Sequence, residues 1–444
     1  MESNFSHNFR TVNAERFIEY ITDSTEPDRV YIGIGRPTAW PDANVVPTAN
    51  SSLDSVNEVW RNLIGVKRLS GNDVRHVIPR YDWTANTVYS AYDNTTPSAD
   101  LYAENNMFYV LTDEWNVYKC LANNYGAVST VKPTSTLTTG SVETADKYIW
   151  KYMYTLSAEE RLRFMTTEFM PVRTLVADNG SLQWQVQDNA IEGGIEAVLV
   201  TLGGSNYTNA NTISVTISGD GSGARAIARI NTSTNVVSSI VVTNPGVGYS
   251  FATVTIADTG TGVGATARAI ISPEMGHGSN PKFELGGSYV MINPRIRGTE
   301  DGKLPTDNDY RQISIIKNPL LNGTTNVASN TVYSQVTTLV LDTGSTSYVE
   351  DEIVFQGTSV ASASFSGTVV SWDDSNNIIK LVNTVGTATT DVLNGQTSRA
   401  ARLVQSVTNK ELKPFSGEML YISNFSPIQR AVDQTEDFKI VIKF

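Results

Sequence analysis

The sequence contains one cysteine, only three histidines and few charged residues, which make up 18% of the chain. The single cysteine, Cys120, excludes an internal disulfide framework and fits assembly in a reducing cytosol. Inside "VYKCLANNYG" we interpret it as a small buried apolar residue. The histidines are His7, His76 and His277. None has a partner at metal-ligand spacing, so we predict neither a zinc site nor a histidine-based triad, and we interpret His76 as a hydrogen-bonded structural residue.

Long apolar stretches and basic clusters are also missing. No run approaches the roughly 20 apolar residues that span a bilayer. The N-terminal "MESNFSHNFRTVNAERFIEY" has no apolar core of a secretory signal. The formal net charge is −12, and no Lys/Arg cluster offsets it locally. Such a surface repels phosphate backbones and anionic lipid, so we expect a soluble, non-secreted chain with neither nucleic acid nor membrane as partner.

Length and composition are typical of a mainly β protein with several domains. The 444 residues are 40% hydrophobic, enough to fill roughly three or four cores. Helical spacing of apolar residues predicts helices over 13–23 and 52–64. For the second helix we expect a cap at Ser51, Ser52 or Asp54 and a C-terminal cap at Gly65. "SAEERLRF" predicts a short capped helix over 157–164, and alternating patterns after Lys67 predict strands.

An internal repeat occupies the glycine-rich region that follows residue 192. "LVTLGGSNYTNANTISVTISGDGSGARAIARI" is followed by "IVVTNPGVGYSFATVTIADTGTGVGATARAII", with offsets of 39 to 42 residues between matched positions. Tyr207 matches Tyr249 in this alignment. Each unit is interpreted as strand, turn, strand, turn, strand, which predicts a small β module built by duplication.

A second compositional change runs to about residue 411 and is rich in Ser, Thr, Val and Asn. A fainter duplication relates "EIVFQGTS" (352–359) to "DVLNGQTS" (391–398), and predicts another inserted β-barrel or sandwich. The predicted fold class is therefore mainly β and multidomain, with β-sandwich or barrel-like domains, a few N-terminal helices and two inserted β modules.

The predicted domain boundaries follow these changes in composition. They are a core part with two helices (1–82), a small β domain (83–145), a β and short-helix segment (146–191), the glycine-rich repeat module (192–281), core strands (282–320), the Ser/Thr-rich module (321–411) and C-terminal strands that complete the core (412–444).

Two Asp-Thr-Gly triplets, at Asp258 and Asp342, each follow an apolar run, as in the two halves of an aspartic protease. Such a site needs two equivalent lobes whose aspartates share a proton. Here they are 84 residues apart and lie in regions of different composition. In the repeat alignment, moreover, "ADTGTG" falls on the glycine-rich turn "SGDGSG" of the first unit. We therefore interpret both triplets as a strand end and a turn, and predict no proteolysis.

Other chemistry-bearing patterns have similarly simple interpretations. "GDGSGA" and "GTGVGA" meet a dinucleotide fingerprint only in part and precede strand-like segments, so they are interpreted as turns. "DNDYRQ" and "WDDSNN" lack the acidic spacing of a calcium loop and are interpreted as solvated turns. Arg80, Asp82 and Trp83 suggest an Arg–carboxylate pair beside an aromatic ring. It serves either as a domain-edge latch or as a partner contact. No catalytic residue, cofactor, metal site or small-molecule substrate is predicted.

Several segments outside the two inserts resemble a known family. "YIGIGRPTAWPD" and a helix with Trp60 open the match. It continues in order with "VIPRYDW" (77–83), "VYKCL" (117–121), "DKYIWKYMY" (146–154), "YRQISIIKNPL" (310–320) and "SGEMLYISNFSPIQRAVDQTEDFKIVIKF" (416–444). Together they resemble the dimeric baseplate wedge subunit of T-even-like contractile-tailed bacteriophages. The two inserts have no counterpart in that resemblance.

The resemblance implies a non-enzymatic structural subunit of the virion tail baseplate, made in the host cytoplasm. It implies a homodimer that holds other wedge proteins and takes part in the rearrangement that triggers sheath contraction. A rival hypothesis is a β-rich adhesin or carbohydrate-binding protein that uses the glycine-rich repeats. Aromatic and arginine residues often anchor interfaces. In the matched segments the candidates for partner contact are Trp40, Arg80, Tyr81, Asp82, Trp83, Tyr310, Arg311, Arg430 and Asp433.

Overall fold

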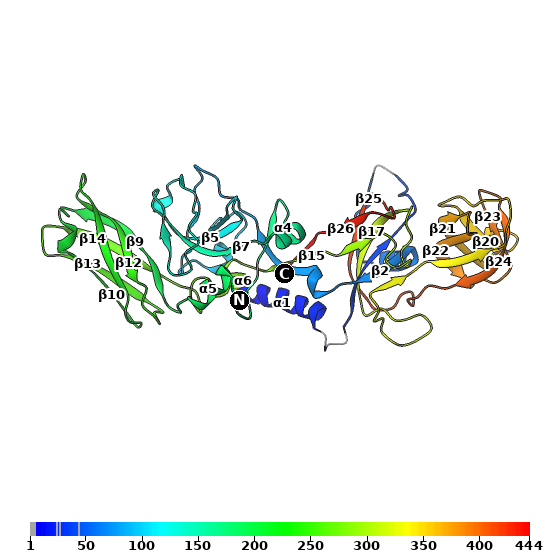
Figure 1. Ribbon diagram of the computed structural model, residues 1–444, viewed down its shortest axis with the longest axis horizontal. Coiled ribbons are helices and arrows are strands. Elements are labelled where there is room, and N and C mark those ends of the chain that lie inside the picture. The colour runs from blue at the N-terminus through cyan, green and yellow to red at the C-terminus, as the bar shows by residue number, and fades with distance from the viewer. Residues whose placement is uncertain (1–5, 24, 26–27, 43–44) are drawn as a thin grey trace. The chain divides into compact units, whose positions relative to one another are not determined.

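The computed structural model describes residues 6–23, 25, 28–42 and 45–444. The chain forms two compact units, each assembled from segments that are distant in sequence (Figure 1). Unit 1 runs to Phe17, resumes over Arg75–Ile292 and ends with Ile440–Phe444, and unit 2 contains Ile18–Val74 and Asn293–Lys439. Strands dominate both units, so the predicted mainly β fold with few helices is confirmed.

Unit 1 contains two four-stranded sheets besides its barrel. One has the order β27-β15-β3-β8 and the other β4-β5-β7-β6. Their strands are β3 (Val74–Pro79), β4 (Tyr109–Leu111), β5 (Asn116–Asn123), β6 (Val142–Glu143), β7 (Tyr148–Thr155), β8 (Phe169–Pro171), β15 (Tyr289–Ile292) and β27 (Ile440–Lys443). β5 and β7 are buried along nearly their whole length, because both read as continuous apolar and aromatic runs rather than alternating ones.

Short helices complete unit 1. They are α3 (Ser98–Leu101), α4 (Ala158–Phe164), α5 (Leu182–Asp188) and α6 (Pro281–Glu284), and α1 (His7–Thr22) contributes its first residues. The helix predicted over 157–164 is confirmed as α4. Ser157 accepts a hydrogen bond from the Glu160 amide at 3.2 Å, while the Glu160 carboxylate accepts one from the Ser157 amide at 3.1 Å. This reciprocal capping box satisfies two amide groups that the first turn leaves free.

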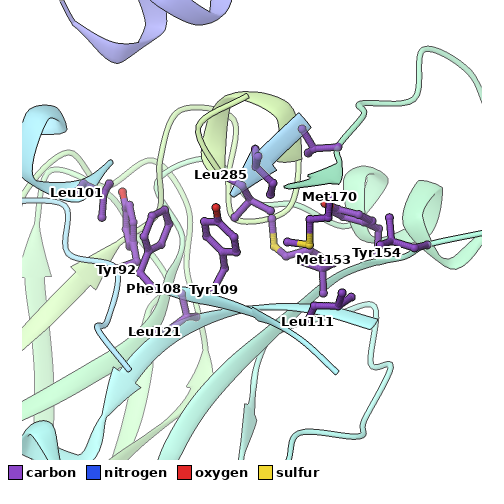
Figure 2. Packing of buried hydrophobic residues seen from close by; sticks show 14 of the residues in the cluster. Tyr92, Leu101, Phe108, Tyr109, Leu111, Leu121, Met153, Tyr154, Met170 and Leu285 are labelled. Atoms are coloured by element: carbon purple, nitrogen blue, oxygen red, sulfur yellow. The ribbon is translucent and has the colours of Figure 1, made fainter. Parts of the chain in front are cut away.

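The main apolar core of unit 1 is formed by buried side chains of the two sheets, including Leu121, Met153 and Met170 (Figure 2). Ala197 and Ile270 belong to the same core, although both lie on strands of the inserted barrel. The barrel is therefore packed into unit 1 through its first and last strands and shares its core.

The glycine-rich repeat forms a closed six-stranded barrel. Its strands are β9 (Ile195–Ser205), β10 (Ile213–Gly219), β11 (Arg225–Asn231), β12 (Val236–Asn244), β13 (Ala252–Asp258) and β14 (Val263–Ile271). Around the barrel the order is β9-β12-β11-β10-β13-β14. Matched residues of the two repeats pair directly, Val198 with Ile240 and Thr216 with Thr255. An internal two-fold axis thus passes between β9 and β12 and between β10 and β13.

Unit 2 is built on an antiparallel sheet with the order β18-β2-β1-β17-β25. Its elements outside the barrel are β1 (Val30–Gly35), α2 (Leu53–Asn62), β2 (Leu63–Arg68), β16 (Arg295–Arg297), β17 (Asp309–Lys317), β18 (Val332–Ser334), β25 (Glu418–Gln429) and β26 (Thr435–Asp437). α2 begins after Ser52, whose hydroxyl accepts a hydrogen bond from the Ser55 amide at 3.2 Å, so Ser52 is the cap among the three candidates.

The expected role of Gly65 as a helix cap is wrong. The chain passes from α2 directly into β2, and Gly65 lies in the middle of that strand. A Cβ atom at this position would clash with the Leu304 side chain and with the Tyr333 carbonyl. Glycine is therefore required here by close packing against neighbouring elements rather than by helix termination.

The Ser/Thr-rich module is a second closed barrel. It comprises β19 (Thr337–Leu341), β20 (Ile353–Gln356), β21 (Phe365–Asp373), β22 (Ile378–Gly386), β23 (Val392–Gly395) and β24 (Ala401–Thr408). Around the barrel they follow the order β19-β22-β21-β20-β23-β24. Numbered from the first strand of each module, the two barrels have one and the same strand order. The faint duplication noted in the sequence again relates strands that pair, β20 with β23.

Candidate functional site

The most unusual polar group in unit 1 lies where the first barrel joins the sheet. Lys119 on β5 and Lys151 on β7 are direct cross-strand partners, and both side chains are fully buried. Like charges in this position repel, and each would be costly to bury alone. The site therefore needs two anions.

Glu284, the last residue of α6, neutralises Lys119, with 2.9 Å between the ammonium and Oε2. Its other oxygen accepts hydrogen bonds from the Gly278 amide at 2.7 Å and the Asn280 amide at 3.2 Å. Lys119 also lies over the Tyr92 ring, 3.9 Å from its centroid. The segment that leaves the barrel is in this way fixed to β5.

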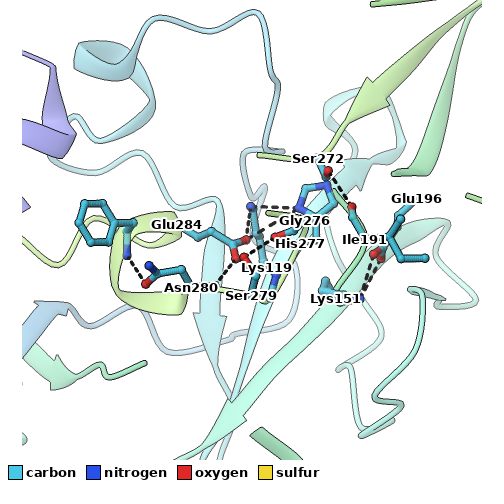
Figure 3. Close-up of polar contacts among 12 residues, drawn as sticks. Lys119, Lys151, Ile191, Glu196, Ser272, Gly276, His277, Ser279, Asn280 and Glu284 are labelled. Carbon is cyan, nitrogen blue, oxygen red and sulfur yellow. Dashed lines mark hydrogen bonds and ion pairs between the residues drawn. The ribbon is translucent and has the colours of Figure 1, made fainter. Parts of the chain in front are cut away.

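Glu196 neutralises Lys151, with its two oxygens 3.0 and 3.1 Å from the ammonium. Glu196 is the second residue of β9, so it belongs to the segment that leads into the barrel. The two pairs thus clamp both ends of the insertion onto neighbouring strands (Figure 3). Removing one member of a buried pair is expected to cost about 3–5 kcal/mol, because a buried charge is left without compensation.

His277 completes this cluster. Its Nδ1 lies 3.1 Å from the Lys119 ammonium, so Nδ1 is the acceptor and the ring is neutral. Burial, together with the charges of Lys119 and Lys151, holds the pKa of His277 well below its ordinary value. Burial also lowers the pKa of Lys119 against the attraction of Glu284, and raises that of Glu196 against Lys151. The place where both ends of the barrel meet the sheet is called its joint. At this joint each charged group is paired with a group of opposite charge.

No sequence motif marks this cluster. The usable signal was a single charged residue inside each of two apolar strands, in "VYKCL" and "WKYMY". Charged residues are almost never fully buried unless paired. Partners could therefore have been expected, but not their identity, since Glu284 is 165 positions from Lys119.

The Asp-Thr-Gly triplets are structural, as predicted. Asp258 ends β13, and its carboxylate accepts hydrogen bonds from the Gly260 and Gly262 amides at 3.0 and 2.7 Å. Asp342 directly follows β19, and its carboxylate accepts one from the Leu403 amide at 2.9 Å. The two aspartates lie in different barrels and different units. The Asp258 carboxylate organises its own loop, whereas the Asp342 carboxylate ties the end of β19 to β24.

The glycine-rich turns have a reciprocal structural role. Tyr207, from the first repeat, lies beneath the turn of the second, and its hydroxyl accepts a hydrogen bond from the Ala265 amide at 3.2 Å. Tyr249, from the second repeat, lies beneath the turn of the first and accepts one from Ala224 at 3.3 Å. A Cβ atom at Gly262 or Gly221 would clash with the corresponding ring. These glycines make room for an aromatic plug, and no phosphate-binding helix follows them.

The remaining histidines and the cysteine also have structural surroundings. The His76 Nδ1 lies 2.8 Å from the Gly287 carbonyl oxygen, as expected of a hydrogen-bonded residue. His7 stacks on Tyr102 with ring centroids 4.0 Å apart. Burial lowers the pKa of each histidine to about 4. Cys120 is buried, as predicted. Among the residues that the structure describes, no three His, Cys, Asp or Glu side chains are grouped to hold a metal ion.

Four of the nine candidate contact residues are buried and engaged within unit 2. Trp40 donates to the Phe425 carbonyl at 2.9 Å. Tyr310 packs edge-on against Phe438, and Arg311 reaches the Pro37 carbonyl. Arg430 is 1% exposed and pairs with Glu436 at 2.8 Å. These side chains hold the unit together, and their role toward partners stays a prediction.

The other five candidates lie nearer the surface. Arg80 and Asp82 form the expected bidentate pair, at 2.7 and 2.8 Å, and Arg80 also donates to the Thr166 carbonyl. Trp83 donates to the Ser129 hydroxyl at 3.2 Å. Tyr81 is partly buried, whereas Asp82 and Asp433 are exposed. Of the nine, Asp82 and Asp433 are the most accessible to another protein.

No helix in the described ranges is both long and apolar enough to cross a membrane. Comparison with known proteins adds the following. The family model described as "Bacteriophage T4, Gp8" matches residues 3–134. "Baseplate wedge protein gp8" of Enterobacteria phage T4 is 24% identical over 224 residues, which cover 40% of this chain and 66% of that protein. The match therefore spans slightly less than two thirds of the relative. It confirms the resemblance to the T-even-like wedge subunit.

Proposed function

From the similarity to the T4 baseplate wedge protein, we infer that this protein is a structural subunit of a phage tail baseplate and resides in the virion tail. The match over 224 residues is the observation that carries this proposal. It rests on the N-terminal part of the chain for the family model and on a partial alignment for the relative.

The role is one of scaffolding, without catalysis. The structural support is the way polar residues are used. The buried charges at the first barrel are matched in pairs, the Asp-Thr-Gly carboxylates bind backbone amides, and the glycine-rich turns hold aromatic plugs. Such paired and hydrogen-bonded groups favour one rigid arrangement. A rigid part is what an assembly needs at a contact that must hold its neighbours in register.

We further propose that the subunit is a homodimer, binds other wedge proteins and takes part in the rearrangement that triggers sheath contraction. Light scattering on the full chain tests the first point. A dimer has twice the chain mass of 48.4 kDa, and a monomeric mass at micromolar concentration would contradict it. Co-expression with the other wedge proteins of the same phage tests the second, and failure to recover any stable complex would contradict the assembly role.

The glycan-binding rival has less support. The repeat tyrosines, Tyr207 and Tyr249, are 1% and 5% exposed. They are used inside the barrel and are not available as a stacking surface for sugars. A glycan array with the full chain separates the two hypotheses, because specific glycan binding would favour the rival for the first barrel.

A further inference from the structure

The joint of the second barrel differs from that of the first in its charges. The segments that lead into and out of this barrel are held together through Gln335, whose side-chain amide donates to the Leu412 carbonyl and accepts from the Leu412 amide, both at 3.1 Å. The nearby anion is Glu411, which pairs with Lys303 and accepts a hydrogen bond from the Ser334 amide at 2.6 Å. Its charge is therefore already compensated.

Two cations at this joint have no such compensation. Lys410 is 9% exposed, and its ammonium makes no hydrogen bond or ion pair with any residue that the structure describes. Burial lowers its pKa to about 8. Arg61, in the last turn of α2, likewise has no ion pair or side-chain hydrogen bond within the described part of the chain. Arg61 is half-buried, whereas Lys410 is almost fully buried. An unpaired charge is costly to bury, so the presence of Lys410 without an anion needs a reason.

Both cations line one cavity of about 260 Å³ in unit 2. Asn322, Asn409 and Thr384 add polar side chains, and Phe365, Ala388 and Phe415 add an apolar wall. No aspartate or glutamate belongs to the lining. The cavity is thus positively charged on one side and apolar on the other.

The first barrel is the internal reference. It has the same strand order, and at its joint each buried lysine meets a glutamate of the chain itself. At the second joint Lys410 and Arg61 have no such partner among the described residues, because the nearby Glu411 is already paired with Lys303. We propose that this cavity is a binding site for a carboxylate that another molecule supplies, and that Arg61 and Lys410 bind the carboxylate oxygens. The proposal does not depend on the role in the baseplate.

A carboxylate fits these walls better than sulfate or phosphate does. Its two oxygens match a guanidinium bidentately, with the ammonium as a second donor. Its carbon stem can pack on Phe365 and Ala388. A tetrahedral anion would instead turn further oxygens toward that apolar wall, where they would lose hydrogen bonds to water.

Benzoate, acetate and sulfate, titrated into the full chain at constant ionic strength, test the proposal by thermal unfolding and calorimetry. We expect a saturable rise of the melting temperature, with benzoate binding most tightly. Lys410→Met and Arg61→Met should each weaken benzoate binding about tenfold or more, since each removes a charge-assisted contact. Lys413→Met is the matched control, because Lys413 is exposed and lies outside the cavity lining.

Two outcomes would overturn the proposal: no benzoate shift in the natural protein at millimolar concentration, or equal shifts in all variants. Weaker benzoate binding by Lys410→Met cannot be attributed to misfolding if the variant is folded, and we expect it to melt at a higher temperature than the natural protein in anion-free buffer. Native mass spectrometry of the protein as purified distinguishes the sources of the carboxylate. A retained small acid identifies a metabolite as the source. With none retained, tighter binding of a glutamate-containing peptide than of benzoate identifies an acidic side chain of a partner protein.

Discussion

Lys119 and Lys151 face each other across β5 and β7, fully buried, and each is neutralised by a glutamate from one end of the same insertion. The first barrel is therefore part of the electrostatic balance of the sheet that carries it. Four charges from four separate segments must come together before any of them is compensated.

The Lys119–Glu284 pair should be essential for stability. Glu284→Gln leaves Lys119 buried beside a neutral group, so we expect a loss of about 3–5 kcal/mol in the free energy of unfolding. Urea unfolding followed by tryptophan fluorescence measures it. Glu274→Gln is the control, because Glu274 is an exposed acidic residue near the same segment. Equal stability of the two variants would show that the pair contributes little.

The Lys151–Glu196 pair should behave as a coupled unit. Lys151→Met or Glu196→Leu alone leaves the other member of the pair as an unpaired buried charge. The double variant replaces both charged side chains with apolar ones. We expect each single change to cost several times more than the double change, with a coupling of about 2 kcal/mol or more. A double-mutant cycle in urea gives this value, and costs that simply add would contradict the coupling.

Stability should fall as the pH drops below about 6.5. His277 has a pKa held well below its ordinary value, so it binds no proton in the folded state while the unfolded chain does. The stability contributed by this difference is complete above pH 6.5 and decreases as the pH falls, by about 1.4 kcal/mol per pH unit. His76, with a pKa of about 4, acts in the same direction.

The test compares urea midpoints at pH 7.5 and 5.5 for the natural chain and for His277→Gln. In the variant, the slope of the unfolding free energy against pH should decrease by the contribution of about one proton. Glu196 acts in the opposite direction, because burial raises its pKa. For this reason the difference between the two proteins is the measured quantity. Identical slopes would show that His277 is protonated in the folded state.

The packing of the Tyr207 ring should require glycine at position 262. Gly262→Ala places a methyl group against the Tyr207 ring, and we expect a loss of about 1–3 kcal/mol from overpacking. Gly221→Ala should act similarly through Tyr249 on the other side of the two-fold axis. Ser222→Ala, at an exposed neighbour of Gly221, is the control. A first-barrel melting transition unchanged by both glycine variants would contradict the role of the aromatic plugs.

The stability of the protein should rise in mild alkali, because Lys410 then loses its buried charge. Its pKa is lowered to about 8, while an unfolded lysine titrates near about 10.4. Between these values the unfolded state binds more protons, so stability rises with pH across the window. Lys410→Met lacks this rise and should exceed the natural chain most clearly at pH 7. A constant difference from pH 7 to 10 would show that the ammonium is paired.

Local patterns predicted much of the secondary structure. The capping box of α4 and the turns of the repeat were visible because their determinants lie within a few residues of one another. The expectation of a helix cap at Gly65 is wrong because the residues that require glycine there, Leu304 and Tyr333, are far away in sequence. The "SLQWQVQD" segment that forms α5 was not predicted, being short and largely polar.

The joints could not be predicted for the same reason. A strand pattern shows that Lys119 is an exception among apolar neighbours, but Glu284 is identified only by the folded chain. The equivalence of the two barrels was also hidden. The equivalence lies in the strand order, which no sequence pattern of either module shows. In addition, the internal repeat is clear in the glycine-rich module but faint in the Ser/Thr-rich one.

The two-fold axis inside each barrel has a consequence for how such a fold arises and folds. Neither half forms a closed structure, because the first and second strands of one half pair with those of the other. A half barrel leaves its first and second strands without their partners, and duplication with fusion supplies both halves within a single chain. The same pairing makes folding of each barrel cooperative, since a chain that ends after the first repeat has its partner strands missing and must find them in a second copy.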